Sequence, residues 1–293
     1  MTDREPAVHE RAIRIGGVTT RYLEAGDTGA PPLLLLHDGA WGGASDVTWG
    51  ASLPRLAQDF HVLAPDFLGF GGSDKVTYFD RSTYSPRIEQ VEALLSALLV
   101  ERPHVVGSSY GGSIALRMLA ESSIEPRSAV SIGGTGGPWK TRTLVEDLGR
   151  WDGTESDLAR VLRYLMDERH PDFEAQLARR LRWATAPGHF RAVASAVLAL
   201  PEPLRLRVED PWPGTLRGVD TPVLLVQGTQ DELFEPEWTT GIASLLEDVQ
   251  VVRMDSLHSP NLDHPEQLVG LIRTFIGSVE RVPVDVRSLH GGE

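Results

Sequence analysis

The run GSSYGG at positions 107–112 contains a serine in the setting of a nucleophile. It follows the apolar run HVV and precedes residues at helical spacing, so Ser109 falls at a turn from a strand into a helix. Such a turn crowds the backbone, and Gly107 and Gly111 supply the small residues it needs on either side. The turn lifts the Ser109 hydroxyl above a sheet, at a helix N-terminus that favours negative charge. We therefore predict that Ser109 is a catalytic nucleophile.

A serine hydroxyl needs a base to take its proton, and the base needs a carboxylate to orient it. After an elbow of this kind, the acid precedes the histidine along the chain. Asp231 follows the apolar run 223–227, and His258 follows the run 249–254, both at strand ends where catalytic groups gather. We predict Asp231 as the acid and His258 as the base. The alternative acids are Glu232, Glu235 and Asp255.

An acyl-transfer mechanism also needs backbone N–H donors for the oxyanion. The residue after the nucleophile, Tyr110, supplies one donor, and the loop after an earlier strand supplies the other. That loop reads HDGAWGG at 37–43, and its glycines allow the backbone to approach a ligand closely. We predict Gly39 as the second donor. The alternatives in the same loop are Asp38 and Ala40.

The elements that must position these residues alternate between short apolar runs and longer segments of helical spacing. Gly16 and Gly17 separate two runs and predict a hairpin. The predicted strands cover residues 11–15, 18–24, 32–37, 60–65, 104–108, 129–132, 223–227 and 249–254. The predicted helices cover residues 52–59, 86–100, 113–120, 237–246 and 265–276. This alternation predicts an α/β fold with a mostly parallel sheet between helices.

Residues 137–218 interrupt the alternation, because they contain helical patterns and no convincing strand. The predicted helices there cover residues 144–148, 158–166, 173–183 and 189–200. We predict a core of residues 1–137 and 216–293, with residues 138–215 inserted as a helical cap (lid). A lid over an active site is the natural use of such an insertion, and a packing domain without a catalytic role is the alternative.

Composition excludes several other classes of function. The 293 residues include 28 Lys and Arg against 41 Asp and Glu, and the net charge of −13 disfavours nucleic-acid or anionic-membrane partners. Without cysteine, a thiolate nucleophile, a thiolate metal site and disulfides are all excluded. The N-terminus is not a signal peptide, and no apolar run has the ~20 residues of a membrane helix. We expect a cytoplasmic monomer or homodimer acting on a small molecule, with no metal and no cofactor.

Two other enzyme classes fit the motifs less well. His258, Asp263 and His264 are possible metal ligands, but they lack the spacing of a hydrolytic zinc site. The glycines at 133–137 follow a strand, but their spacing is not that of a dinucleotide-binding turn. We interpret that run as a hinge into the cap.

Five motifs in this order resemble the α/β-hydrolase superfamily over nearly the whole chain. They are LLLLHDGAWGG, APDFLGFGGSD, VVGSSYGG, LLVQGTQD and LHSPNLDHPE. The resemblance implies an α/β-hydrolase fold with an eight-stranded sheet and a lid, and a serine hydrolase acting on a small carbonyl compound. A lyase or cyclase that reuses the same three residues is the alternative.

Within the superfamily the chain looks most similar to the meta-cleavage-product hydrolases, which cut carbon–carbon bonds of vinylogous diketones. That resemblance rests on the first two motifs and on QLARRLRWATAPG at 176–188. It implies that Arg180 contacts the substrate, with Arg179 and Arg182 as register alternatives. Trp183 is a further candidate to line the substrate site.

The chain departs from that subfamily at positions that would hold the substrate. Ser108 and Thr48 stand where asparagine is usual, and Asp38 stands where glycine is usual. Ser108 and Thr48 are therefore candidate substrate-binding residues with altered chemistry. Hydrolysis of an ester or lactone and carbon–carbon hydrolysis both stay open.

Overall fold

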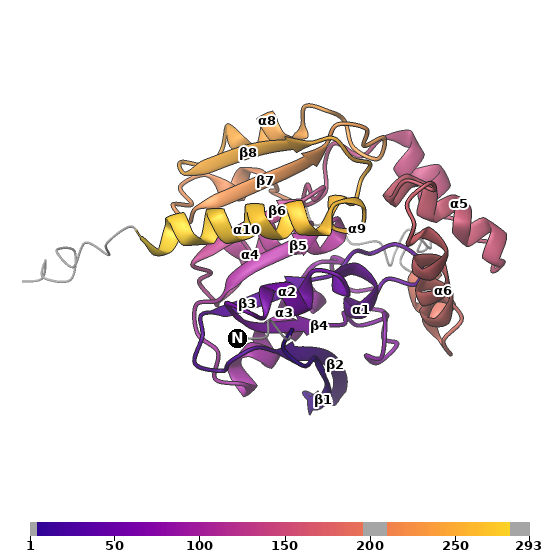
Figure 1. Cartoon of the computed structure of the whole chain (residues 1–293), viewed down its shortest axis with the longest axis horizontal. Coiled ribbons are helices and arrows are strands. Elements are labelled where there is room, and N and C mark those ends of the chain that lie inside the picture. The colour runs from indigo at the N-terminus through magenta and orange to yellow at the C-terminus, as the bar shows by residue number, and fades with distance from the viewer. Residues whose placement is uncertain (1–4, 196–209, 282–293) are drawn as a thin grey trace, which may run out of the picture.

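The computed structural model of the chain describes residues 5–195 and 210–281. Its centre is one sheet of eight strands, in the order β1-β2-β4-β3-β5-β6-β7-β8 (Figure 1). Each pair from β4 to β8 is parallel, whereas β1 with β2 and β2 with β4 are antiparallel. The mostly parallel, eight-stranded α/β fold predicted from the sequence is confirmed.

The strands coincide with the predicted apolar runs to within two residues at each end. They are β1 (His9–Ile15), β2 (Val18–Ala25), β3 (Pro32–Leu36), β4 (His61–Pro65), β5 (His104–Ser108), β6 (Ser128–Ile132), β7 (Val223–Gly228) and β8 (Val249–Met254). The hairpin between β1 and β2 turns at Gly16 and Gly17, whose φ angles are 60° and 87°. Two consecutive positive φ angles strain other residues and suit glycine, which explains this pair.

Helices cover both faces of the sheet. Those outside the insertion are α1 (Ser45–Trp49), α2 (Leu53–Leu56), α3 (Ser85–Ala97), α4 (Tyr110–Glu121), α8 (Trp238–Ala243), α9 (Pro260–Asp263) and α10 (Pro265–Glu280). On β3, Leu33 and Leu35 pack with α2 and α10, whereas Leu34 and Leu36 pack with α3 and α4. Successive strand residues point to opposite faces, so a continuous run of leucines fits a strand buried on both sides.

The chain between β6 and β7 is helical where the structure describes it. It contains a π-helical turn η1 (Leu144–Leu148), then α5 (Glu155–Leu165), α6 (Phe173–Ala184), α7 (His189–Ser195) and a 3₁₀ turn η3 (Gly214–Leu216). The Thr154 hydroxyl accepts the Asp157 N–H, so α5 begins earlier than the predicted 158. In Figure 1, α5 and α6 lie beyond the end of the sheet, on the side of α1 and α9. Residues 196–200 of the last predicted helix lie outside the described residues.

The sequence analysis did not predict the short helix α1. Its first turn is fixed by a distant group, because the Ser45 N–H donates to Asp66 Oδ1 at 2.8 Å. A helix of five residues has little intrinsic stability, so this tertiary contact decides its position. Within residues 5–195 and 210–281, no helix combines the length and apolar character needed to cross a bilayer.

Candidate active site

Ser109 lies at a strained turn between β5 and α4. Its φ and ψ angles are 55° and −113°, an unfavourable conformation for a residue with a side chain. A Cβ on Gly107 would overlap the carbonyl oxygen of Gly111, and a Cβ on Gly111 would overlap that of Leu36. Both glycines are therefore required by close backbone contacts. The Ser109 N–H donates to the Ile132 carbonyl at 2.6 Å and ties the turn to β6.

The structure brings together the three side chains predicted from separate motifs. His258 Nε2 lies 2.8 Å from Ser109 Oγ, and His258 Nδ1 lies 2.8 Å from Asp231 Oδ2. The His258 and Asp231 side chains are buried. In this arrangement Nδ1–H donates to the carboxylate, leaving Nε2 to accept the serine proton.

The loops after β7 and β8 hold the acid and the histidine in place. The Leu233 N–H donates to Asp231 Oδ1 at 2.8 Å, which leaves Oδ2 to face the imidazole. The Phe234 ring lies 5.6 Å from the His258 ring, and a Cβ on Gly133 would come 2.9 Å from His258 Cε1. The glycine run at 133–137 therefore also makes room for the histidine.

The other acids suggested by the sequence have different surroundings. The Asp255 carboxylate accepts hydrogen bonds from Thr229 and Gln230. Among the described contacts, neither Glu232 nor Glu235 places a carboxylate oxygen on His258.

Two of the three candidate N–H donors in the loop after β3 are already hydrogen-bonded. The Asp38 N–H donates to Thr48 Oγ1 at 3.3 Å, and the Ala40 N–H donates to Asp38 Oδ1 at 3.0 Å. Within the described residues, the N–H groups of Gly39 and Tyr110 have no acceptor. These two residues are adjacent, because a Cβ on Gly39 would lie 2.8 Å from Tyr110 Cβ. The geometry thus favours Gly39 over both of its neighbours.

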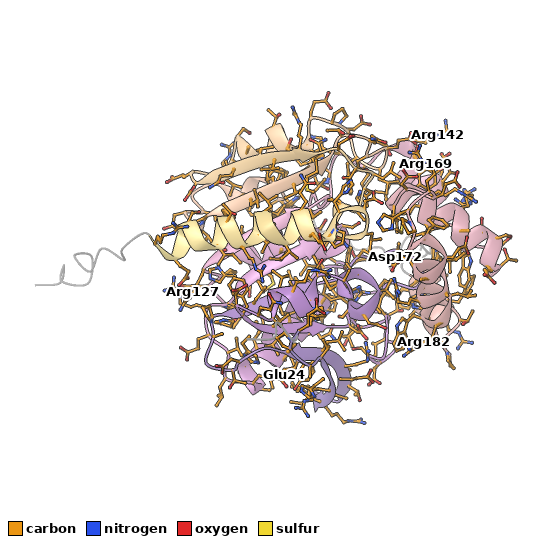
Figure 2. The ribbon with its side chains drawn as sticks, in the orientation of Figure 1. Glu24, Arg127, Arg142, Arg169, Asp172 and Arg182 are labelled. Carbon is orange, nitrogen blue, oxygen red and sulfur yellow. The ribbon has the colours of Figure 1, made fainter. Side chains whose placement is uncertain are left out.

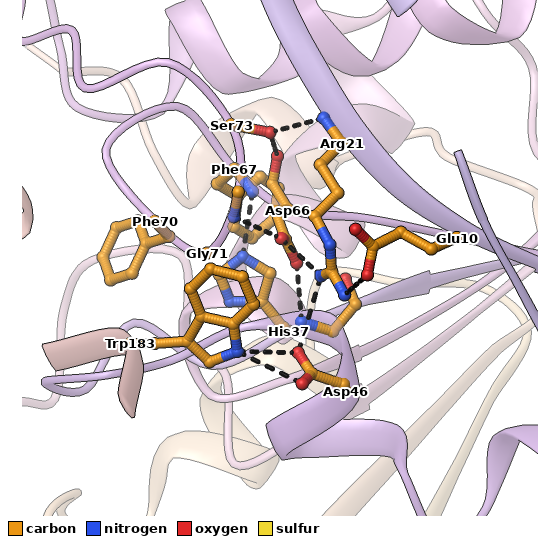
Figure 3. Close-up of polar contacts among 12 residues, drawn as sticks. Glu10, Arg21, His37, Asp46, Asp66, Phe67, Phe70, Gly71, Ser73 and Trp183 are labelled. Atoms are coloured by element: carbon orange, nitrogen blue, oxygen red, sulfur yellow. Dashed lines mark hydrogen bonds and ion pairs between the residues drawn. The ribbon is translucent and has the colours of Figure 1, made fainter. Parts of the chain in front are cut away.

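His37 fixes the start of this loop. Its Nδ1–H donates to the Asp38 carbonyl at 2.6 Å, and its Nε2 accepts the Phe67 N–H at 2.9 Å (Figure 3). Burial lowers the pKa of His37, in keeping with a neutral ring that donates at one nitrogen and accepts at the other. His37 therefore braces the loop.

The Arg180 side chain extends from α6 to the loop after β3. Its guanidinium makes a bidentate ion pair with Asp38, with N–O distances of 2.7 and 3.1 Å, and donates to the Trp41 carbonyl at 3.3 Å. Both charged side chains are fully buried. Burial would raise the pKa of Asp38, but Arg180 and the Thr48 hydroxyl lower it to about 2. Arg179 and Arg182, the register alternatives, are exposed, and Arg182 is at the periphery in Figure 2.

Trp183 connects the same helix to α1. Its Nε1–H donates to both oxygens of Asp46, at 3.0 and 3.2 Å (Figure 3). The guanidinium carbons of Arg21 and Arg182 lie 4.9 and 4.5 Å from the centre of its ring. Arg21 in turn pairs with the buried Asp66 at 2.7 Å. The contacts of Trp183 are therefore with residues that hold α6 against the core.

Asn261 is a residue that the sequence analysis missed. It accepts a hydrogen bond from Ser108 Oγ at 3.0 Å and donates to the Thr48 carbonyl at 2.9 Å. Thr48 Oγ1 itself donates to Asp38 Oδ2 at 2.7 Å. A buried polar chain thus joins the serine turn, the histidine loop and the loop after β3. The motif LHSPNLDHPE placed this asparagine three residues after His258, which was the available signal.

The described residues hold no group of three side chains arranged to bind a metal ion. His264 Nε2–H donates to the Asp255 carbonyl, and Asp263 accepts the Asp167 N–H. The His264 side chain thus serves the connection between β8 and α10, and the Asp263 side chain contacts the segment after α5.

Comparison with known proteins matches the chain to a family. The model of the "Alpha/beta hydrolase family" matches residues 33–271. The chain is 26% identical to a 2-hydroxy-6-oxo-6-(2'-aminophenyl)hexa-2,4-dienoic acid hydrolase of Metapseudomonas resinovorans, over 93% of this chain and 92% of the relative.

Two solved structures share the fold. One is a serine hydrolase involved in carbazole degradation, with a TM-score of 0.78 and 27% identity, covering 93% of this chain and all of the other. The second is the 2-hydroxy-6-oxo-6-phenylhexa-2,4-dienoate hydrolase from Rhodococcus sp. strain RHA1, with a TM-score of 0.81 and 23% identity, covering 93% and 99%. Because the family model matches most of the chain, from β3 through β8 with the Ser109 turn and both later loops, this chain belongs to the α/β hydrolase family.

Proposed function

We propose that the protein is a serine hydrolase acting on a small carbonyl substrate, with Ser109 as nucleophile, His258 as base and Asp231 as the orienting acid. The observation that carries the proposal is the hydrogen-bonded sequence Ser109–His258–Asp231, with both distances at 2.8 Å. The three residues come from three separate strand ends, and a purely structural role would not require their mutual alignment.

In the proposed mechanism, His258 Nε2 takes the Ser109 proton as Oγ attacks the carbonyl carbon. The N–H groups of Gly39 and Tyr110 hold the negative charge that develops on the carbonyl oxygen. His258 then protonates the leaving group, and Asp231 stabilises the imidazolium in between. Water, activated by the same histidine, releases the acid product and restores Ser109.

We also propose that residues 138–215 act as a cap on a core formed by residues 1–137 and 216–293. Support comes from the position of α5 and α6 between β6 and β7 and from the contact of Arg180 with Asp38 in the loop after β3. A cap in this position would select substrates and exclude water during the reaction.

Two kinds of carbonyl substrate fit this chemistry. An ester or lactone needs only the nucleophile, the base and the oxyanion donors. A vinylogous diketone acid is the second candidate, because the relative from Metapseudomonas resinovorans is named for a dienoic acid. Carbon–carbon hydrolysis would require ketonisation of that substrate before attack.

A substrate panel tests the proposal. It contains p-nitrophenyl esters of graded chain length, lactones and a coloured ring-fission diketone, each assayed with the wild type and Ser109→Ala. We expect Ser109→Ala to lower kcat/KM by ~10⁴-fold or more on every accepted substrate. Full turnover by Ser109→Ala would refute the assignment of Ser109 as the nucleophile. Conversion of a substrate without uptake of water would favour a lyase or cyclase.

A further inference from the structure

The ion pair between Asp38 and Arg180 carries an inference about substrate charge. It lies beside the proposed oxyanion site, since Asp38 precedes Gly39 and the Arg180 guanidinium also reaches the Trp41 carbonyl. Of the described arginines, Arg180 is the one whose side chain hydrogen-bonds within residues 38–41. It is therefore the cation best placed to meet an anionic group on a substrate there.

The Arg180 guanidinium is already paired with a carboxylate of the protein itself, that of Asp38. Both Asp38 oxygens face it, and the same oxygens accept the Thr48 hydroxyl and the Ala40 N–H. The exposed fractions of the two charged residues are 1% and 0%. A bidentate pair with further hydrogen bonds neutralises both charges where water does not reach.

From this arrangement we propose that Asp38 is a specificity-determining residue that sets the enzyme for substrates without a carboxylate near the reacting carbonyl, namely uncharged esters or lactones. A substrate carboxylate that paired with Arg180 would displace Asp38 and leave a buried carboxylate without its partner, which is strongly unfavourable. Without displacement, the incoming anion would lie close to Asp38 and be repelled. Selection against a competitor by an unpaired or like charge is a general route to specificity.

This inference rests on the proposed serine-hydrolase function, and its test separates the two. The substrates are p-nitrophenyl pentanoate and p-nitrophenyl hydrogen glutarate, which differ in a terminal methyl against a carboxylate. For the wild type we expect kcat/KM to favour the uncharged ester by about tenfold or more. Equal rates, or a preference for the glutarate ester, would overturn the inference. Failure to hydrolyse either ester, together with every substrate of the panel, would count against the proposed function.

Variants of the pair test its charge. Asp38→Asn keeps the shape of the side chain and frees the charge of Arg180, so the preference should shift toward the glutarate ester by about tenfold. Arg180→Gln removes the cation and should not produce that shift. The double variant has neither the Asp38 carboxylate nor a free Arg180 cation, so its preference should lie between those of the wild type and Asp38→Asn.

Asp46→Asn is the matched control, because Asp46 also contacts α6, through Trp183. Asp46→Asn removes one acidic charge from the contact between α6 and the core but leaves the Asp38–Arg180 pair intact. The ester preference of this variant should therefore equal that of the wild type. An Asp38→Asn protein that folds and keeps the wild-type preference would overturn the role of Asp38. If that variant does not fold, a double variant that keeps the full wild-type preference would overturn the role of Asp38 instead.

Discussion

The edge of the sheet and the contact between α6 and the core are built in different ways. At the sheet edge, Ser109 and Asp231 follow the buried strands β5 and β7, His258 follows the edge strand β8, and the three align through two hydrogen bonds of 2.8 Å. At the α6 contact, the groups that meet include the buried ion pair of Asp38 with Arg180. One region is positioned by the backbone of a regular sheet, and the other by paired charges.

This difference separates two properties of the enzyme. In the proposed mechanism the residues at the strand ends hold the reacting atoms, so changes there should reduce turnover and leave stability nearly unchanged. Residues at the α6 contact bury charge, so changes there should alter stability and substrate preference. The following predictions test that separation.

The largest expected effect is on turnover. Asp231→Asn keeps the shape of the acid but removes the charge that orients and stabilises the His258 imidazolium. We expect kcat to fall by ~10⁴-fold, as is typical for this change in a Ser-His-Asp site. Steady-state kinetics measure the loss, and Glu232→Gln is the control on the neighbouring carboxylate. A loss of less than about tenfold would mean that Asp231 is not the acid.

The next effect is on stability. Arg180→Met leaves the Asp38 carboxylate buried without its cation, so the free energy of unfolding should fall by about 3–5 kcal/mol at neutral pH. The pKa of Asp38, about 2 in the pair, should then rise, because burial is no longer opposed. The loss should therefore shrink as the pH falls and Asp38 takes up a proton.

Urea denaturation across pH measures this effect. Arg179→Met, at the exposed neighbouring position, is the matched control and should change the unfolding free energy by less than about 0.5 kcal/mol. Equal stability of the two variants would show that the buried pair contributes no more than a surface charge.

A smaller effect is expected at the oxyanion site. In Gly39→Ala, the new methyl group would lie 2.8 Å from Tyr110 Cβ, so the loop must shift and move the Gly39 N–H. We expect kcat to fall by about 10²–10³-fold, the usual cost of losing one oxyanion donor. A fall in kcat with little change in KM would identify a transition-state contact. An unchanged kcat would assign the second donor to another N–H.

The smallest effect concerns acid stability. His189 accepts the Gly42 N–H at Nε2 and donates to the Gly69 carbonyl at Nδ1, and the contact at Nε2 needs a neutral ring. Burial lowers the pKa of His189 to about 4, below the ~6.5 of an unfolded chain. The unfolded state therefore binds a proton first, and the stability contributed by His189 is lost as the pH falls from ~6.5 toward 4.

The free energy of unfolding contributed by His189 changes by at most about 1.4 kcal/mol per pH unit. His189→Gln should remove this part of the pH dependence, as measured by thermal unfolding between pH ~4 and ~7. Parallel pH curves for the wild type and the variant would show that the ring is not held neutral.

The sequence predicted the sheet-edge region well because its signals are local. Apolar runs defined the strands, and the glycines around Ser109 marked the turn that the structure contains. Gly39 was chosen from the sequence, but the reason to prefer it over Asp38 and Ala40 came from the structure, because the hydrogen bonds that occupy those two N–H groups depend on side-chain positions.

The α6 contact could not be predicted in the same way. Asp38 and Arg180 are 142 positions apart, and no pattern in either segment indicates that they pair. Resemblance to a subfamily indicated Arg180 as a substrate contact, but not that its charge would already be balanced. The polar chain through Asn261 joins distant segments too, so it also became visible only in the folded chain.

Covalent labelling of the wild-type protein is the sharpest test of Ser109 as an activated nucleophile. A fluorophosphonate reacts with a serine hydroxyl only when a base and an oxyanion site activate it, and intact-mass and peptide analysis locate the adduct. The expected result is one adduct per chain, on Ser109, that persists in the control variant Ser113→Ala and is absent in Ser109→Ala. An unlabelled wild-type protein, or an adduct that persists in Ser109→Ala, would contradict it.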